Sequence, residues 1–225
     1  MVFVHQRLDE YNSKKLYLHY MRYTGARNRI ARREGIDLGL KTAGSKSQAT
    51  LLKKLTILPG QHGTRGRRKI SEHATQLREK QKLRYLYGVT ANQLKNYFAH
   101  ASRKLGNTAF YLTQFLESRL DNVVYKLGFA PTRSSARQLV NHRHIIVNGR
   151  VVDIPSYQVK MGDVITLKEG SIKIPYIEKN LENKDLAIPK WLERQGAVGK
   201  VIGSADLEDV ERIVNLRLVV EFFSR

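Results

Sequence analysis

The chain has 225 residues, and its 40 Lys and Arg outnumber its 20 Asp and Glu, which gives a net charge of +20. A positive charge of this size indicates a polyanionic partner. The chain has no cysteine, which excludes disulfides and thiolate metal sites, and it shows no apolar run of about 18 residues and no secretory signal pattern, so we expect a cytoplasmic protein without a membrane partner.

The positive charge is concentrated in the first half of the chain. Residues 1–105 hold 23 basic and 6 acidic side chains, whereas residues 106–225 hold 17 and 14. Residues 174–225 hold 8 basic and 9 acidic side chains, so we expect this part to pack or to contact protein. The main electrostatic attraction for a polyanion should therefore lie before residue 106.

Residues 1–20 stand apart as an N-terminal extension. Their single Arg and the acidic pair Asp9 and Glu10 do not fit a mitochondrial transit peptide, which should be rich in Arg and poor in acids. Two interpretations remain open. One is a lineage-specific extension, and the other is an upstream start codon assigned in error, with Met21 as the true start.

Residues 21–70 are predicted to form a basic, largely irregular segment that binds RNA. They show many Lys, Arg, Gly and Ser residues and little hydrophobic periodicity, so the segment cannot bury enough apolar surface to fold firmly alone. A solubilising tail is the alternative. Six apolar residues weaken that alternative because they indicate short packed turns: Leu38, Leu40, Leu51, Leu52, Leu55 and Ile57.

Residues 71–114 are predicted to form a helical domain. The first helix runs from Ser71 to about Tyr87, and the second opens with a capping box of Thr90 and Gln93 and ends at Gly106. A third helix starts at Thr108. The apolar residues of the second helix, up to Leu105, recur at helical spacing, which is typical of a core-facing stripe rather than of a surface for stacking bases.

Residues 115–180 are predicted to form a compact module of two short helices and a sheet. Val123, Val124 and Leu127 recur at helical spacing before Gly128, which suits a helix C-terminus. A second helix follows Thr132, a residue type that favours the N-cap position.

The second of these helices carries a pair of arginines. Arg133 and Arg137 lie four residues apart, so we expect both guanidinium groups to point outward from one helical face. Forked donors of this kind suit phosphate oxygens. The alternative is an ordinary solvated face, which is the more common reason for an arginine pair in an average protein.

A hairpin and a further strand are predicted after this helix. Asn148-Gly149 separates two apolar runs, and a type I′ turn requires positive φ at both of its central residues. The next strand is expected from Val164 to Leu167. In the C-terminal segment, residues 181–225, Trp191 is predicted to anchor packing and the apolar run from Leu216 to Phe223 to form a strand.

Residues 119–167 resemble the small RNA-binding domain named after small-subunit ribosomal protein S4. Further motifs resemble the bacterial-type S4 family in the same order along the chain. They are MRYTG from Met21, RREG from Arg32, PGQHG from Pro59, QLREKQKLRYLYGV from Gln76, SRKLGNT from Ser102, PKWLE from Pro189 and VVEFFSR from Val219.

The resemblance implies an α+β fold. A mostly helical N-terminal domain should be joined to a small RNA-binding domain of two helices packed on a short, bent antiparallel sheet, with a long irregular basic N-terminal region. The C-terminal segment should return to pack on the helical domain.

The resemblance also implies a structural, ribosome-bound protein that binds small-subunit (16S-type) rRNA directly and early in assembly. It should contribute to translational accuracy beside the neighbouring protein S5. The residues expected to contact rRNA are Arg22, Tyr23, Arg32, Arg33, Arg78, Lys80, Lys82, Arg84, Arg119, Arg133, Ser134, Arg137, Gln138, His142, Arg143, His144 and Arg150. Those expected to meet mRNA at the entry channel are Arg65, Arg67 and Arg68.

We expect no catalysis, no cofactor, no metal and no DNA partner. Arg119-Leu120-Asp121 is similar to the catalytic motif of pseudouridine synthases, some of which carry the same module. Here the motif opens a helix of the module instead. We expect Asp121 to be stabilised by the dipole at the N-terminus of that helix or by pairing with a nearby Arg. His142 and His144 lack further ligands at metal spacing, and the cysteine knuckle that binds zinc in some family members is absent. The alternative is a free-standing RNA-binding or rRNA-modification factor, which would need a further domain.

Overall fold

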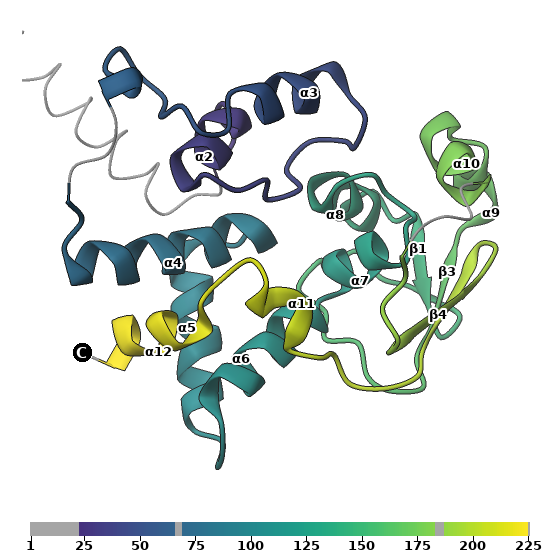
Figure 1. Cartoon of the computed structure of the whole chain (residues 1–225). Helices are drawn as coiled ribbons and strands as arrows, with labels where there is room; N and C mark the ends of the chain where they lie inside the picture. The colour runs from purple at the N-terminus through teal and green to yellow at the C-terminus, as the bar shows by residue number, and fades with distance from the viewer. Residues whose placement is uncertain (1–22, 66–68, 183–186, 225) are drawn as a thin grey trace, which may run out of the picture.

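The computed structural model describes residues 23–65, 69–182 and 187–224. Figure 1 shows a group of helices beside a smaller part built on a sheet. The helices are α2 (Arg27–Glu34), α3 (Lys46–Lys53), the 3₁₀ helix η1 (Gly63–Arg65), α4 (Glu72–Tyr87), α5 (Ala91–Ser102), α6 (Thr108–Glu117), α7 (Leu120–Lys126), α8 (Arg133–Asn141), α9 (Glu169–Ile172), α10 (Pro175–Glu182), α11 (Glu208–Glu211) and α12 (Leu216–Ser224). The strands are β1 (Ile145–Val147), β2 (Arg150–Val151), β3 (Val164–Leu167), β4 (Leu192–Gln195) and β5 (Val198–Val201). In the described ranges, none of the helices has the length and apolar character needed to cross a membrane.

The basic N-terminal segment contains two helices, α2 and α3, of eight residues each. Gly35 ends α2 in the left-handed conformation, with φ 73, and the Ser45 side chain caps α3 by accepting a hydrogen bond from the Gln48 N–H. Leu38 and Leu51 are buried, so the packed turns indicated by the apolar residues are present. The segment therefore contains more regular structure than predicted. The prediction relied on hydrophobic periodicity, which does not reflect the capping residues at the ends of α2 and α3.

α4, α5 and α6 form the helical domain, and α12 packs against all three (Figure 1). Leu83, Leu94, Leu116 and Val219 are fully buried in the core that these four helices share. The C-terminal end of the chain therefore supplies part of the core of a domain that begins near residue 71.

The predicted strand from Leu216 to Phe223 is wrong, since these residues lie in helix α12. A short continuous apolar run fits a buried strand and a buried helix equally well. Packing decides in favour of the helix: Leu216 and Val219, three residues apart, face the same core, and Phe223 stacks on Phe98 with ring centres 4.8 Å apart.

The capping box of Thr90 and Gln93 is present, but α5 ends at Ser102 rather than at Gly106. Leu105 lies outside the helix with 96% of its surface exposed, so the predicted core stripe does not extend to it. Gly106 lies outside the helix with φ 118, and the next residue, Asn107, caps the start of α6 with its side chain.

The module combines α7 and α8 with a five-stranded antiparallel sheet of order β2-β1-β3-β5-β4. Val123 of α7 and the strand residues Ile145 and Ile165 are fully buried in one common core. The predicted hairpin is confirmed, because Asn148 and Gly149 both have positive φ, 49 and 79. The strand predicted from residue 164 to 167 is β3.

The sheet continues beyond residue 180, where the module was predicted to end. β4 and β5 form a second hairpin that turns at Gly196, and β5 pairs with β3. Gly199 of β5 packs directly against the side chain of Leu127, the residue that follows α7. Trp191, the predicted packing anchor, is buried in the module core next to this hairpin.

Candidate nucleic-acid interface

α8 is held in place by a capped start and by one apolar face. The Thr132 hydroxyl accepts a hydrogen bond from the Ser135 N–H at 3.2 Å, as predicted for an N-cap. Ala136, Leu139 and Val140 are buried in the module core. The opposite side of the helix is left for polar residues.

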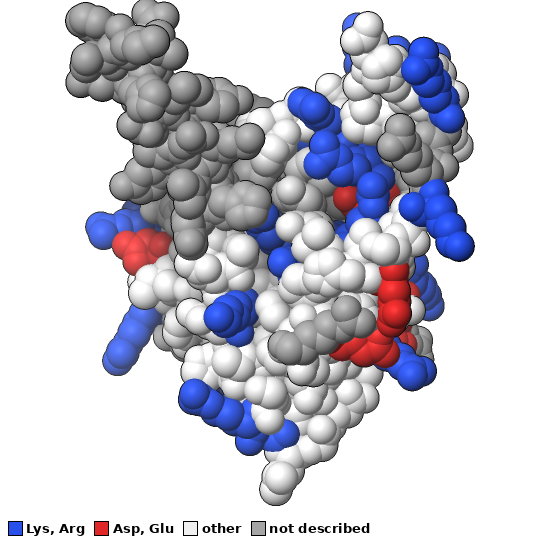
Figure 2. Space-filling model, turned by 90° about the vertical axis from the view of Figure 1, so that its left-hand side faces the viewer, with Lys and Arg blue, Asp and Glu red and all other residues white. Residues whose placement is uncertain are grey.

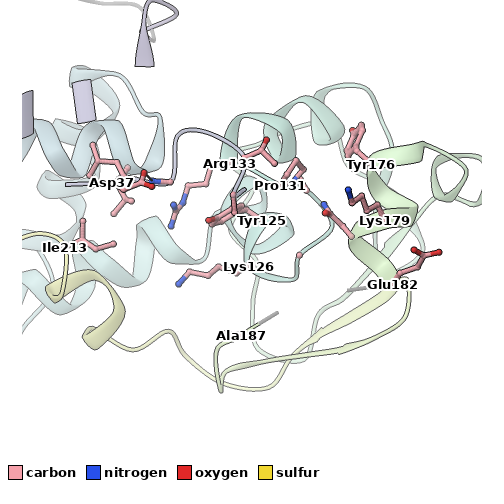
Figure 3. A pocket seen from close by; sticks show the side chains of 18 residues that line it. Asp37, Tyr125, Lys126, Pro131, Arg133, Tyr176, Lys179, Glu182, Ala187 and Ile213 are labelled. Carbon is pink, nitrogen blue, oxygen red and sulfur yellow. Dashed lines mark hydrogen bonds between the residues drawn. The ribbon is translucent and has the colours of Figure 1, made fainter. Parts of the chain in front are cut away.

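Arg133 and Arg137 lie on one side of α8, but they turn toward α7. Arg133 Nε donates to Asn122 Oδ1 at 2.8 Å, and its guanidinium lies 4.6 Å from the centre of the Tyr125 ring (Figure 3). Arg137 Nη1 lies 3.5 Å from a carboxylate oxygen of Asp121. The predicted outward orientation is therefore wrong, because aromatic and polar groups on the neighbouring helix attract both side chains.

Arg119 has no exposed surface. Its Nε and Nη2 donate to the two carboxylate oxygens of Asp121 at 3.0 and 2.7 Å, and its Nη1 donates to the Tyr97 hydroxyl at 2.7 Å. The prediction of Arg119 as an rRNA contact is wrong, because its guanidinium is fully engaged inside the protein. The expected pairing of Asp121 with a nearby Arg is confirmed.

α8 ends in a Schellman motif that has Arg143 where glycine is usual. The His144 N–H donates to the Leu139 carbonyl at 3.1 Å, and the Arg143 N–H donates to the Val140 carbonyl at 3.0 Å. Arg143 has φ 62, in the left-handed region that disfavours a side chain. Its side chain is 72% exposed, and its Nε lies 3.0 Å from Asp153. Arg143 thus combines an unfavourable backbone conformation with a guanidinium group that is exposed to solvent.

The other predicted contacts of the module lie at or near the surface. Gln138, His142 and Arg150 are exposed, and Ser134 is partly exposed. His144 is partly exposed as well, and its Nδ1 lies 2.8 Å from the Ser171 hydroxyl, which turns the ring toward α9.

On the helical side, the predicted contacts around α2 are accessible to different degrees. Tyr23 and Arg33 are exposed. Arg32 is partly exposed and donates to the carbonyls of Ile57 and Leu58 at 3.0 and 3.2 Å. Arg32 therefore fastens the chain that follows α3, in addition to its predicted role at the surface.

Two predicted contacts on α4 are tied to α2 and to their own helix. Arg78 Nη1 donates to the Arg33 carbonyl at 3.0 Å and lies 3.7 Å from the carboxylate of Glu34. Glu34 is buried, and this burial raises its pKa although Arg78 acts in the opposite sense. Lys82 pairs with Glu79 at 2.6 Å.

Two further predicted contacts on α4 pack against rings. Lys80 Nζ lies 4.3 Å from the centre of the Phe222 ring, and burial, together with the nearby charge of Arg84, lowers the pKa of Lys80. Arg84 is buried, with its guanidinium 5.4 Å from the Tyr85 ring. Arg84 stays a predicted rRNA contact, although the protein itself covers most of its side chain.

The residues predicted at the mRNA entry channel are described in part. Arg65 ends η1 and is exposed. Arg67 and Arg68 lie outside the described residues, and so does Arg22, a predicted rRNA contact.

Many exposed basic residues lie outside the predicted set. They include Arg29, Lys46, Lys53, Lys54, Lys69, Lys95, Arg103, Lys104, Lys160 and Lys200. Figure 2 shows Lys and Arg spread over one face of the molecule with fewer Asp and Glu between them. The density of Lys and Arg in residues 27–69 was a sequence signal for several of these positions.

A cleft of about 1010 Å³ opens between residues 37–43, the turn from α7 to α8, and α10 (Figure 3). Its lining includes Tyr125, Arg133, Tyr176 and Lys179. Rings and cations in a concave surface suit unpaired nucleotides, whose bases stack and whose phosphates attract Lys and Arg. Sequence reasoning missed this cleft, because its walls come from segments far apart in the chain.

The exposed side chains of the described residues suit the binding of phosphate groups. In the part of the chain that the structure describes, no three His, Asp or Glu side chains gather in a way that could hold a metal ion. The exposed functional groups are chiefly ammonium and guanidinium donors, which suit phosphate oxygens.

Comparisons with known proteins agree with the resemblance seen in the motifs. The model of the ribosomal protein S4/S9 N-terminal domain matches residues 22–117, and the model of the S4 domain matches residues 118–165. Small ribosomal subunit protein uS4 of Persephonella marina is 47% identical over 209 residues, which cover 90% of this chain and 98% of that protein. The uS4 proteins of Bordetella avium and Thermus thermophilus are both 47% identical over 207 residues, which cover 91% of this chain and 99% of theirs.

Proposed function

The chain belongs to the family of small ribosomal subunit protein uS4, and we propose that it binds small-subunit rRNA directly through two basic surfaces. One surface lies on the N-terminal half and the other on the module. The protein is a structural, RNA-binding constituent of the small subunit and not an enzyme. The match to uS4 proteins over 98% or more of their length carries this conclusion, and it gives no support to a free-standing modification factor.

The exposed groups suggest how the RNA is recognised. Lys and Arg neutralise phosphates and release counterions, which supplies most of the affinity and makes it depend on salt. A double-stranded RNA groove hides most base edges, so the spacing of basic groups should read the shape of the folded RNA rather than its sequence. Arg143 and Arg150 on the module and Arg29 and Lys46 near the N-terminus are exposed and available for this role.

Sucrose-gradient fractionation of a cell extract tests the proposal. We expect the protein to sediment with small subunits in stoichiometric amount, in the cytoplasm and bound to ribosomes. A pool that is entirely free of subunits would overturn the proposal. Pulse-labelled assembly intermediates should already contain the protein if it binds rRNA early.

Two finer roles are part of the proposal. We propose that the exposed Arg65 and the adjacent Arg67 and Arg68 meet mRNA at the entry channel, as the family resemblance implies. We also propose contact with protein S5 and an effect on translational accuracy. Chemical cross-linking of intact subunits followed by mass spectrometry tests the S5 contact, and peptides of the two proteins should be joined.

A further inference from the structure

Buried polar side chains cross the boundary between the helical domain and the module. α6 ends at Glu117 and α7 begins at Leu120, so only two residues separate the two parts along the chain. Two sets of hydrogen bonds and ion pairs pass over this boundary, and we name them together the junction network. Its members are Tyr87, Tyr97, Glu117, Arg119, Asp121, Asn122, Arg133 and Arg137.

The first set joins α4 to α8 through Asn122. The Tyr87 hydroxyl donates to one carboxylate oxygen of Glu117. The other oxygen accepts from Asn122 Nδ2 at 2.7 Å, and Asn122 Oδ1 accepts from Arg133 Nε at 2.8 Å. The Arg133 guanidinium lies 5.3 Å from the Tyr87 ring, which completes a closed circuit. Burial and the neighbouring Glu117 raise the pKa of Tyr87 well above its ordinary value, so its hydroxyl remains a donor.

The second set joins α5 to α8 through Asp121. The Tyr97 hydroxyl of α5 accepts from Arg119 Nη1 at 2.7 Å, and Arg119 holds Asp121 with two hydrogen bonds. Arg137 of α8 lies 3.5 Å from the same carboxylate. One buried carboxylate therefore holds two arginines, one at the start of α7 and one on α8.

Stability alone does not explain these buried ions. Removing a charge from water is costly, and apolar residues of similar volume often stabilise a core as well as an ion pair does. Hydrogen bonds differ from apolar contacts in that they require particular distances and angles. A fully satisfied polar network therefore selects one arrangement of the elements that it joins.

We infer that Tyr87, Arg119 and Asn122 are positioning residues for RNA binding, which hold the basic surfaces of the N-terminal half and of the module in the one relative orientation that fits the RNA. This inference rests on the proposed function. If only a fraction of the molecules has the orientation that can bind RNA, the apparent affinity is reduced to that fraction of its full value. Loosening the junction should thus lower affinity although no contact with RNA is removed.

Asn122→Leu tests the inference most directly. Asn122 is only 1% exposed, so it cannot touch RNA, and leucine, which has the same branching, removes all three of its side-chain hydrogen bonds. If the competent orientation falls to about a tenth of the population, the affinity for a 16S-type rRNA fragment falls about tenfold. The slope of log affinity against log salt should stay at its wild-type value, because no phosphate contact is lost.

A change inside the network that removes no charge separates positioning from contact. Tyr87 is 3% exposed and donates to Glu117, so Tyr87→Phe should behave like Asn122→Leu, with weaker binding and an unchanged slope. Arg143→Ala removes an exposed arginine of the same module and should reduce the slope by about one. A slope that falls in Tyr87→Phe or Asn122→Leu as it does in Arg143→Ala would overturn the inference.

The relative orientation can be measured without RNA. The chain has no cysteine, so spin labels can be attached through Ser102→Cys in the helical domain and Met161→Cys in the module, both at exposed positions. Pulsed electron paramagnetic resonance should give one narrow distance distribution for the labelled parent and a broader one for Asn122→Leu. Ile165→Ala, a buried change on β3, which carries no member of the network, controls for lost stability and should keep the narrow distribution.

An unchanged distribution in Asn122→Leu would contradict the inference even if RNA binding weakens. If that variant does not fold, Tyr97→Phe removes a single hydroxyl from the second set, and the same broadening and the same unchanged salt slope are expected. Failure of the wild-type chain to bind the rRNA fragment would count against the proposed function, whereas the spin-label distances would still decide whether the junction is fixed.

Discussion

Arg119 and Asp121 face each other across two hydrogen bonds, of 3.0 and 2.7 Å, inside a region closed to solvent. Both charges have left water. The Arg119 guanidinium depends on this carboxylate for compensation, whereas Asp121 also has Arg137 at 3.5 Å. Removal of Asp121 alone should therefore lower stability far more than removal of both partners.

The first prediction follows from this dependence. Asp121→Ala leaves the Arg119 guanidinium buried without a carboxylate and should lower the free energy of unfolding by about 3–5 kcal/mol. The double variant Arg119→Met/Asp121→Leu should lower the free energy of unfolding little or not at all, because apolar side chains of similar volume replace the ion pair. Urea unfolding measures both, and equal losses in the two variants would show that the pair is not the cause.

The second prediction concerns Arg143, which adopts φ 62 where glycine is favoured. A side chain in the left-handed region costs about 1–2 kcal/mol, and glycine loses part of that advantage through its freer unfolded chain. Arg143→Gly should therefore raise the free energy of unfolding by about 0.5–1 kcal/mol. The same variant should bind rRNA more weakly, with a smaller salt slope.

Gly88 provides the control for this prediction. It ends α4 at φ 61, and no atom lies within 4 Å of an added Cβ, so Gly88→Ala tests the backbone conformation alone. It should lower stability by about 1 kcal/mol. A destabilised Arg143→Gly would mean that the contact of Arg143 with Asp153 outweighs the backbone strain.

The third prediction is a pH dependence that originates at Glu34. Burial raises the pKa of Glu34 above its value in the unfolded chain, so the folded state favours the protonated carboxyl. The contribution of Glu34 to the free energy of unfolding is complete at a pH below the pKa that Glu34 has in the unfolded chain. This contribution is lost as the pH rises through the higher pKa of Glu34 in the folded protein. Glu34→Gln lacks this loss, so its stability relative to wild type should increase from pH 4 to pH 7. Thermal unfolding at both pH values measures the difference, and the opposite trend would show that the attraction of Arg78 dominates.

The fourth prediction concerns Gly199 of β5, which lies against the side chain of Leu127, the residue that follows α7. A Cβ added at Gly199 would lie 2.4 Å from one methyl carbon of Leu127 and 2.7 Å from the other. Because Leu127 is fully buried and has little room to move, Gly199→Ala should lower the free energy of unfolding by about 1–3 kcal/mol. Gly170→Ala is the matched control: it lies in α9 with nothing within 4 Å, and alanine should stabilise the helix by up to about 1 kcal/mol. Comparable melting temperatures for the two variants would refute the steric argument.

The fifth prediction tests the mRNA entry channel. Replacement of Arg65, Arg67 and Arg68 by Ala removes three cations that are proposed to face the message rather than the folded rRNA. Subunit assembly should be affected less than translation through stable mRNA hairpins. Reconstitution yield and a hairpin reporter provide the two readings, and equal loss in both would argue for an rRNA contact instead.

Local patterns predicted the module well because its signals are local. The N-cap at Thr132, the Asn148-Gly149 turn and β3 each follow from neighbouring residues whose backbone preferences agree. The second hairpin, β4–β5, was missed. Its turn at Gly196 gave a weaker signal, and its strands are short and contain Gly199.

Functional residues were harder to predict because side-chain direction depends on distant partners. Arg119 and Arg84 are basic residues in a strongly basic chain, and sequence alone placed them with the RNA contacts. Their burial results from groups on other helices, such as Tyr97 for Arg119. Likewise, α12 could be recognised as a helix only once α4, α5 and α6 provided the surface that it covers.

The place of α12 in the helical domain has a consequence for the nascent chain. Gln76 in α4 donates to Glu221 in α12, 145 residues further along, and the Glu79 carboxylate accepts from the Asn215 N–H. While the ribosome is still making the module, the apolar sides of α4, α5 and α6 remain uncovered. Exposed surface of this kind promotes aggregation and is what chaperones protect. The cell's chaperones should therefore be needed most for the helical domain, whose core stays incomplete until α12 has been synthesised.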